Sequence, residues 1–239
     1  MTIKVSVVGA SGRMGALALS LIDAASDLSL HSALDSKSDL SEINGADVVF
    51  DVTRLDVSTA VVDAAVSAGI PVVVGTSGWS EGKLSQLAPV VAKVSGTVVV
   101  IPNFSIGSML ASKFAAEAAK HFSNIEIVET HHAGKVDSPS GTAIRTAELI
   151  SKNRKEQPLI VGADQEARGE VVAGVPIHSL RLQGVSAKQE VLLSGSAELL
   201  TIAHETSGVN AYAHGVLAAI RFAAKKPVGV HVGLDSVLA

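Results

Sequence analysis

Two adjacent histidines, a lysine and a hydroxyl-rich turn stand close together near the middle of the chain. His131 and His132 are followed by Lys135 and then by Ser140-Gly141-Thr142. Imidazole and ammonium groups can donate protons or hold an anion, and a turn that starts a helix offers backbone N–H groups for the same purpose. Two anion-binding elements in one short stretch suit a substrate that carries two carboxylates.

Three interpretations of the paired histidines are open at this stage. A zinc site needs further ligands at suitable spacing, and the chain contains no cysteine and no H-E-x-x-H string. Histidines satisfied within a core or at a cap are the structural alternative. The functional alternative is anion capture, with a proton supplied by His131 or Lys135 after hydride transfer. That combination favours a reductase of a small dicarboxylate.

A glycine-rich turn near the N-terminus could bind the cofactor that such a reduction needs. The β-branched run 3–8 ends in Gly9-Ala10-Ser11-Gly12-Arg13-Met14-Gly15, and a helical pattern over 14–24 follows. Glycines let the chain turn tightly and let a pyrophosphate approach the N–H groups at the start of the helix. The string is a G-x-x-G-x-x-G variant of the usual motif, so a plain strand-to-helix turn is the alternative.

An acidic residue follows the second predicted strand. The run 28–34 leads to Asp35, at the distance from the glycine turn where a carboxylate commonly binds the ribose hydroxyls of NAD. Lys37 and Arg13 could instead compensate the 2′-phosphate of NADP. A turn residue at the end of a strand is the structural alternative. The choice between NADH and NADPH therefore stays open.

Strands and helices alternate through the first part of the chain. Further strands are predicted at 47–51, 71–74 and 97–101, with helices at 58–68 and 81–92. This alternation predicts right-handed βαβ units and a doubly wound parallel sheet of the Rossmann type. Ligands of such sheets bind beyond the carboxyl ends of the strands. Three polar or glycine-rich segments fall there: Asp51-Val52-Thr53-Arg54, Gly75-Thr76-Ser77-Gly78 and Pro102-Asn103-Phe104-Ser105.

The pattern changes in the second half. It predicts a helix at 108–122, a strand at 125–130 that leads to the histidines, a helix at 142–153, a polar segment at 151–157 and a loop at 162–169. Strands at 171–182, 188–193 and 198–204 follow without helices between them, which indicates a partly antiparallel sheet. The expected fold class is α/β, an N-terminal doubly wound Rossmann domain with a second α+β domain built on a mixed sheet. The last predicted helix, 212–225, could return to cover the first domain.

Composition argues against several classes of protein. Aromatic residues make up only 3% of the chain and the net charge is −4 without a basic block, so nucleic-acid binding is not expected. No apolar run approaches the roughly 18 residues of a membrane span. A strand pattern begins at once after Met1, which leaves no room for a signal peptide. We therefore expect a soluble, cytoplasmic protein with no membrane partner.

Taken together, the motifs resemble one family. The string from His131-His132 through Lys135 to Ser140-Gly141-Thr142-Ala143 is similar to that of the dihydrodipicolinate reductases, also called 4-hydroxy-tetrahydrodipicolinate reductases. The glycine turn and the three segments at 51–54, 75–78 and 102–107 match in the same order. The family belongs to the diaminopimelate route to lysine, so the resemblance implies an NAD(P)H-dependent reductase of that pathway.

The resemblance implies a role for each matching position. The residues expected to bind NADPH or NADH are Gly9, Ser11, Gly12, Arg13, Met14, Asp35, Thr53, Arg54, Gly75, Ser77, Pro102, Asn103 and Phe104. The residues expected to bind the substrate carboxylates are His132, Lys135, Ser140, Gly141, Thr142 and Ser77. His131 and Lys135 resemble the family's proton donors, and the sequence does not decide which of them acts.

The resemblance also implies an architecture and an assembly. Residues 1–103 with 213–239 would form the dinucleotide-binding domain, and residues 104–212 the domain for substrate binding and oligomerisation. A homotetramer without a metal is expected. Ser77 stands where many members have Thr, and Val209 where many have Arg. Two alternatives remain: a related reductase of another small dicarboxylate, and a dinucleotide-binding sensor or scaffold without catalysis, which would not need the histidines and Lys135.

Overall fold

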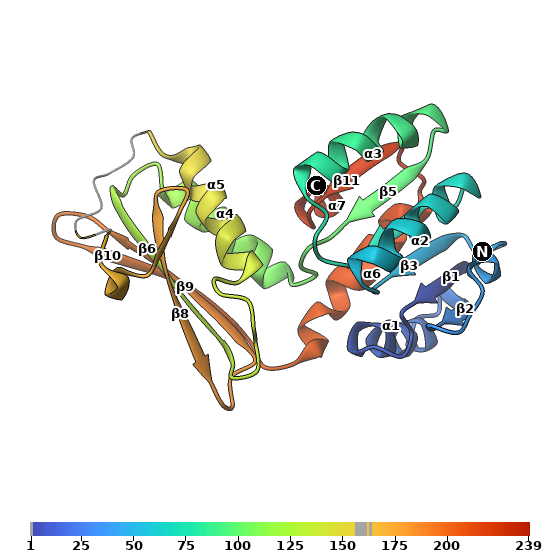
Figure 1. Cartoon of the computed structure of the whole chain (residues 1–239), viewed down its shortest axis with the longest axis horizontal. Helices are drawn as coiled ribbons and strands as arrows, with labels where there is room; N and C mark the ends of the chain where they lie inside the picture. Colours follow the sequence, from blue (N-terminus) through green and yellow to red (C-terminus); the bar gives the residue numbers. More distant parts are fainter. Residues whose placement is uncertain (1, 156–161, 163) are drawn as a thin grey trace. The chain divides into compact units, whose positions relative to one another are not determined.

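The computed structural model describes residues 2–155, 162 and 164–239. The chain divides into two compact units, one made of Met1–Ile106 with Val209–Ala239 and the other of Gly107–Gly208 (Figure 1). Parts of the predicted polar segment 151–157 and loop 162–169, at positions 156, 157 and 163, lie outside the described residues.

The first unit is built on a six-stranded parallel sheet in the order β11-β5-β4-β3-β1-β2. Its strands are β1 (Ile3–Val8), β2 (Leu28–Leu34), β3 (Val48–Asp51), β4 (Val72–Val74), β5 (Thr97–Val100) and β11 (Gly229–Val232). The predicted doubly wound sheet is thereby confirmed. The chain moves in opposite directions from β1 toward β2 and toward β3, and the carboxyl ends at such a point bind ligands in this class of fold.

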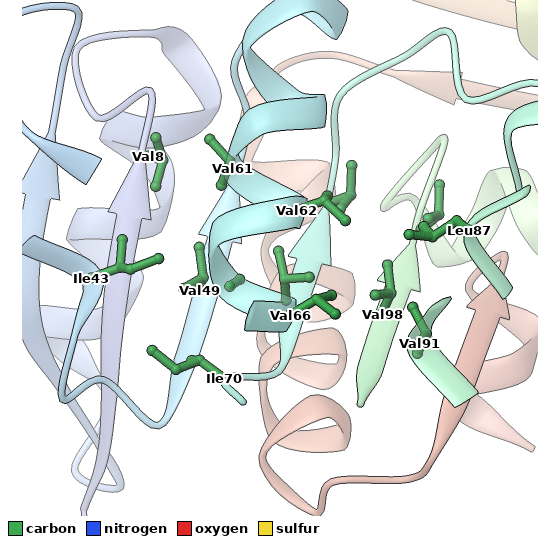
Figure 2. Packing of buried hydrophobic residues seen from close by; sticks show 14 of the residues in the cluster. Val8, Ile43, Val49, Val61, Val62, Val66, Ile70, Leu87, Val91 and Val98 are labelled. Atoms are coloured by element: carbon green, nitrogen blue, oxygen red, sulfur yellow. The ribbon is translucent and has the colours of Figure 1, made fainter. Parts of the chain in front are cut away.

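Helices α1 (Arg13–Ala24), α2 (Leu55–Ser67), α3 (Glu81–Lys93) and α6 (Ala213–Ala224) cover the two faces of this sheet. Figure 2 shows Val61, Val62 and Val66 of α2 packed with strand residues such as Val49 and Val98. Central parallel strands are buried on both faces, which explains the continuous valine runs of β4 and β5. Helix α6 contacts β3, β4 and β5, so the predicted return of the last helix is confirmed.

The second unit is built on a five-stranded mixed sheet in the order β10-β9-β6-β8-β7. Its strands are β6 (Asn124–His132), β7 (Glu170–Val172), β8 (Val175–Leu182), β9 (Ala187–Ser194) and β10 (Leu199–Thr206). Strands β6 and β8 are parallel, whereas the other neighbours are antiparallel. Helices α4 (Ile106–Ala118) and α5 (Gly141–Asn153) lie over one face and close an alanine- and isoleucine-rich core (Figure 1). The predicted mixed sheet is confirmed.

Several elements differ from the sequence predictions. The single strand predicted at 171–182 is a β-hairpin, because Ala173 and Gly174 turn through positive φ angles of 48° and 75°. The strand predicted to end at residue 130 continues through His132, so both histidines lie on β6. Strand β11 and the short helix α7 (Asp235–Leu238) were not predicted.

Two features are absent from the described residues. No helix among them is long and apolar enough to cross a membrane. They also contain no cluster of three His, Asp or Glu side chains that could hold a metal ion.

Candidate active site

The end of β6 sends its two histidines to opposite faces of the sheet. Side chains alternate along a strand, so His131 shares a face with Glu129, whereas His132 leaves toward the other face and is exposed. The ring of His132 lies next to Gly134, where an added Cβ would stand 3.5 Å from Nδ1. The structure therefore separates the directions of two side chains that the sequence presents as a pair.

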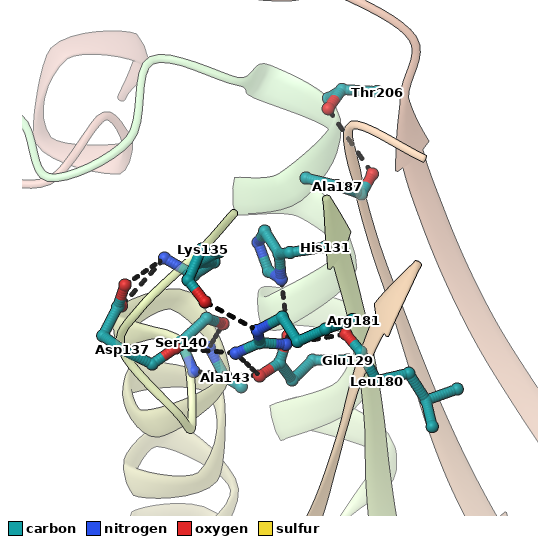
Figure 3. Close-up of polar contacts among 10 residues, drawn as sticks. All are labelled: Glu129, His131, Lys135, Asp137, Ser140, Ala143, Leu180, Arg181, Ala187 and Thr206. Atoms are coloured by element: carbon teal, nitrogen blue, oxygen red, sulfur yellow. Dashed lines mark hydrogen bonds and ion pairs between the residues drawn. The ribbon is translucent and has the colours of Figure 1, made fainter. Parts of the chain in front are cut away.

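Glu129 is completely buried beneath His131 and collects hydrogen bonds from three parts of the unit (Figure 3). His131 donates from Nδ1 to Oε2 at 2.5 Å. The two Nη atoms of Arg181, on β8, donate to the two carboxylate oxygens at 3.0 Å each. The backbone N–H of Ser140 donates to Oε1 at 3.2 Å. This buried carboxylate thus joins β6, β8 and the residue that precedes α5.

Arg181 extends the network into the loop that carries Lys135. Its Nη2 donates to the carbonyl of Asp137 at 2.6 Å, and its Nε donates to the carbonyl of Lys135 at 3.3 Å (Figure 3). The Lys135 ammonium group bonds both carboxylate oxygens of Asp137, at 2.7 and 2.8 Å. The loop is therefore held at its backbone, while the ammonium group is oriented by its neighbouring carboxylate.

The predicted anion-binding turn starts helix α5. Ser140 is its N-cap residue, and its Oγ accepts from the N–H of Ala143 at 3.2 Å. A Cβ added to Gly141 would meet no described atom within 4 Å, so there is space beside the first residue of the helix. The positive end of the helix dipole lies at this space, which suits a carboxylate.

Burial and hydrogen bonding set the charges of the two groups beneath the site. Burial raises the pKa of Glu129, but hydrogen bonds from Arg181, Ser179 and His131 outweigh it, and the net pKa is below its usual value. Burial lowers the pKa of His131, Lys135 and Arg181 add to this effect, and Glu129 opposes it only in part. At neutral pH, Glu129 is therefore ionised and His131 is neutral. Because an ionised carboxylate can only accept, the imidazole proton resides on Nδ1.

The glycine turn of the first unit has the geometry of a phosphate cradle. Gly9 adopts a φ of +88°, and a Cβ there would lie 2.7 Å from the carbonyl oxygen of Val52. Gly12 precedes α1 and makes no side-chain capping bond, so it leaves the first N–H groups of the helix available to a ligand. A Cβ on Gly15 would lie 2.2 Å from the oxygen of Gly9. The predicted residues of this turn fit the pyrophosphate of a dinucleotide.

The three polar or glycine-rich segments predicted to contact a ligand follow the carboxyl ends of β3, β4 and β5. A Cβ on Gly75 would lie 2.7 Å from the ring of Phe104 and 3.0 Å from the side chain of Val52. Phe104 is buried and stacks at a tilt on Phe50, with ring centroids 5.6 Å apart. Ser77, Pro102 and Arg54 are exposed at this edge of the sheet.

A buried carboxylate, Asp51, organises these segments. Its Oδ1 accepts from the N–H and the hydroxyl of Thr53, at 3.1 and 2.6 Å. Its Oδ2 accepts from the hydroxyl of Thr76 at 3.1 Å and from that of Ser58. Asp51 thus ties the segment after β3 to the segment after β4. Both segments were predicted at this edge of the sheet, but no role was predicted for Asp51 itself.

Asp35 is exposed at the end of β2 and closes its own turn. Its Oδ1 accepts from the N–H of Lys37 at 2.8 Å and from the hydroxyl of Ser38 at 3.3 Å. The residue therefore has the structural role of a turn residue, and Oδ2 takes no part in these two bonds. The described contacts are compatible with ribose binding by the same carboxylate.

Two residues of the network, Glu129 and Arg181, were not among the predicted site residues. The spacing of Glu129 and His131 was the available signal, because residues two apart on a strand share a face. Arg181 had no local signal, since it reaches the site through the register of β8 against β6, in which it pairs with His131.

Comparison with known proteins covers both units. Residues 3–104 match the family model described as dihydrodipicolinate reductase, N-terminus, and residues 107–238 match the model described as dihydrodipicolinate reductase, C-terminus. A relative from Clavibacter michiganensis subsp. michiganensis is 49% identical over 241 residues, which are 100% of this chain and 87% of the relative. One from Beutenbergia cavernae is 44% identical over 246 residues, 100% of this chain and 99% of the relative. Both relatives are named 4-hydroxy-tetrahydrodipicolinate reductase.

Comparison with solved structures agrees with the sequence comparisons. The dipicolinate-bound dihydrodipicolinate reductase from Paenisporosarcina sp. TG-14 superposes with a TM-score of 0.87 at 28% identity, over 98% of this chain and 99% of that one. A probable dehydrogenase from Thermotoga maritima, at 12% identity and a TM-score of 0.62 over 98% of this chain and 92% of that one, shares the fold alone. With both of its units matched and relatives similar over its whole length, the chain belongs to the dihydrodipicolinate reductase family.

Proposed function

We propose that this chain reduces 4-hydroxy-tetrahydrodipicolinate to tetrahydrodipicolinate, with a hydride from NADPH or NADH and the loss of water. The observation that carries the proposal is the buried network that fixes His131, the Lys135 loop and the start of α5 as one unit. Relatives 49% and 44% identical are named for this reaction, and the Paenisporosarcina protein was solved with dipicolinate, a dicarboxylate of related shape.

The carboxylates of the substrate would be held by positive groups and backbone amides. Lys135 supplies a cation, and the start of α5 at Gly141 and Thr142 supplies amide N–H groups and the helix dipole. His132 would add a donor from the neighbouring end of β6. Fixing a diacid at both ends would orient its reactive carbon, and such positioning can supply much of the rate of a bimolecular step.

We assign proton donation to Lys135 and not to His131. The neutral His131 carries its proton on Nδ1, where the ionised Glu129 holds it, so its Nε2 offers a lone pair to the site. The Lys135 ammonium group carries N–H donors and no lone pair, and its side chain is only 20% exposed. Reduced nicotinamide, when bound, supplies the hydride. The protein's part is to orient the diacid and to return a proton.

A coupled assay tests the function directly. The preceding synthase can generate the substrate in place from pyruvate and aspartate semialdehyde, while absorbance follows NADPH and NADH oxidation. Oxidation that requires the synthase is the expected result. If both cofactors bind but neither is consumed, the chain is a dinucleotide-binding protein without this activity.

Cofactor preference is tested at Asp35. We expect Asp35→Ala to weaken NADH binding by about 10- to 100-fold, the range of one charge-assisted hydrogen bond. NADPH should change much less, because its 2′-phosphate replaces the hydroxyl that the carboxylate would bind. Fluorescence titration of both cofactors measures the two dissociation constants.

Asp39→Ala is the matched control, since Asp39 is a nearby exposed carboxylate whose Oδ1 accepts from Ser41 at 2.8 Å as a helix cap. It should leave both dissociation constants almost unchanged. Equal weakening of NADH and NADPH by Asp35→Ala would show that Asp35 does not contact the ribose.

We propose that four copies assemble through the sheet face of the second unit that α4 and α5 do not cover. Leu180 and Leu182 of β8 and Leu199 of β10 project from that face and are 45%, 49% and 64% exposed. Apolar side chains gathered on one sheet face are typical of protein–protein contacts.

Leu180→Glu is expected to reduce the mass measured by light scattering from that of a tetramer, because the change would bury a charge at the contact. Leu30→Glu, on β2 of the first unit and 50% exposed, is the control and should leave the mass unchanged. A tetramer that survives Leu180→Glu at low micromolar concentration would place the interface elsewhere.

A further inference from the structure

We infer that Glu129 is a positioning residue that holds His131 in its Nδ1–H tautomer and, together with Arg181, sets the Lys135 loop and the start of α5 around it. The inference rests on the proposed function, because the site that Glu129 supports is the proposed substrate site. It adds two residues, Glu129 and Arg181, to those that the sequence motif identifies.

The two carboxylate oxygens of Glu129 hold different parts of the site. Oε2 accepts from His131 Nδ1 at 2.5 Å and thereby fixes the ring and its proton. Oε1 accepts from the Ser140 N–H at 3.2 Å and thereby fixes the residue that caps α5. One buried side chain therefore sets the relative position of the imidazole and the helix start. A shift of either oxygen would move a group that faces the substrate.

Arg181 both pairs with Glu129 and holds the Lys135 loop. A fully buried carboxylate is costly unless a cation pairs with it, and the planar guanidinium group contacts both oxygens of Glu129 at 3.0 Å. The same guanidinium group donates to the carbonyls of Lys135 and Asp137. The cation that keeps Glu129 ionised is thus also the group that holds the backbone of the loop beside it.

The site requires a carboxylate at position 129, and a neutral polar side chain would not be enough. All the neighbours of Glu129 in the network are donors, and a carboxylate can accept from each of them. A glutamine with its oxygen toward Ser140 would present an NH₂ group to His131. Nδ1 would then have to accept, and the imidazole proton would move to Nε2. In serine proteases the equivalent change at the triad aspartate costs about 10⁴-fold in turnover through the wrong tautomer.

The chain contains a matched control on the same strand. Glu126 also lies between an arginine and a histidine: it accepts from Arg168 and from His178 Nε2, the latter at 2.7 Å. It belongs to the opposite face of β6, away from Glu129 and His131. Glu126→Gln therefore removes the same charge from the same strand, and from the same kind of partners, without touching the proposed site.

The experiment compares Glu129→Gln with Glu126→Gln in the full-length protein. Nitrogen-15 NMR of histidine-labelled protein reports the tautomer of His131, whose signal among the eight histidines is identified by its loss in His131→Asn. We expect the wild type and Glu126→Gln to show Nδ1–H, and Glu129→Gln to show Nε2–H. Turnover in the coupled assay should fall by about 10²–10⁴-fold in Glu129→Gln alone, with the NADPH dissociation constant unchanged.

Glu129→Asp and Arg181→Lys keep the proposal testable if Glu129→Gln does not fold. Both variants retain an ionised carboxylate beside a cation, so His131 should keep Nδ1–H, while the KM for substrate rises because the network is looser. A wild-type His131 protonated on Nε2, an unchanged tautomer in Glu129→Gln, or equal losses of turnover in both glutamine variants would overturn the inference. The NMR result needs no substrate, so it stands apart from a failure of the proposed reaction, which the wild-type assay alone would reveal.

Discussion

Replacing Lys135 with alanine is expected to lower turnover of 4-hydroxy-tetrahydrodipicolinate by about 10²–10⁴-fold, the usual contribution of a general acid. The dissociation constants of NADPH and NADH should stay near those of the wild type, because the cofactor candidates belong to the first unit and Lys135 to the second. The coupled assay measures turnover, and fluorescence titration measures cofactor binding.

Two further variants test whether the loss of turnover comes from the missing proton donor or from the missing positive charge. Lys120→Ala removes a lysine that bonds Glu117 at 2.7 and 2.8 Å, much as Lys135 bonds Asp137, and it should leave turnover unchanged. Lys135→Arg keeps the positive charge but replaces the ammonium group with a guanidinium group that does not release its protons. It should restore substrate binding and not turnover. Near-normal turnover in Lys135→Ala would end the assignment of this residue as proton donor.

The second large effect is expected from Gly15→Ala, which should abolish dinucleotide binding and destabilise the first unit. The new Cβ would lie 2.2 Å from the Gly9 oxygen and 2.7 Å from the Ala10 Cα. Both are backbone atoms, so the turn that would hold the pyrophosphate has to move. Overpacking of this kind typically costs about 1–3 kcal/mol of unfolding free energy. Chemical denaturation and cofactor titration measure the two effects.

Gly82→Ala provides the comparison within the same fold. Gly82 also lies in the first turn of a helix, α3, but a Cβ there would meet no described atom within 4 Å. Alanine is the better helix former by about 0.5–1 kcal/mol, so this variant should be slightly more stable and should bind cofactor normally. Wild-type binding in Gly15→Ala would show that the turn tolerates the added methyl group.

Much of the first unit could be predicted because its strands and helices are indicated by patterns of neighbouring residues. Parallel strands buried on both faces give apolar runs, and each run is followed by a glycine or polar turn and a helical period. Strand β11 has neither signal: it is four residues long, contains His231, and is only partly buried. It becomes a strand because Gly229–Val232 pairs with Thr97–Val100, which no local pattern reveals.

The site was predictable where its residues are contiguous and not where the fold assembles them. The motif string locates Lys135 and the start of α5 because they are close in sequence. Arg181 and Asp51 act through partners in other elements, on β6 in one case and in the segment after β4 in the other. The hairpin at Ala173 and Gly174 was missed for a different reason, since an apolar run masked the glycine that turns it.

Because β11 pairs with β5, one edge of β5 would stay unpaired during synthesis until β11 has been made. Strand β5 pairs with β4 and with β11, and β11 is made long after the other two strands. At ordinary synthesis rates the intervening chain takes on the order of ten seconds to make. Until β11 pairs with it, β5 would have one open edge along Val98, Val99 and Val100, and such an edge can pair with another chain. Pairing with β11 therefore covers an edge of β5 that would otherwise favour aggregation.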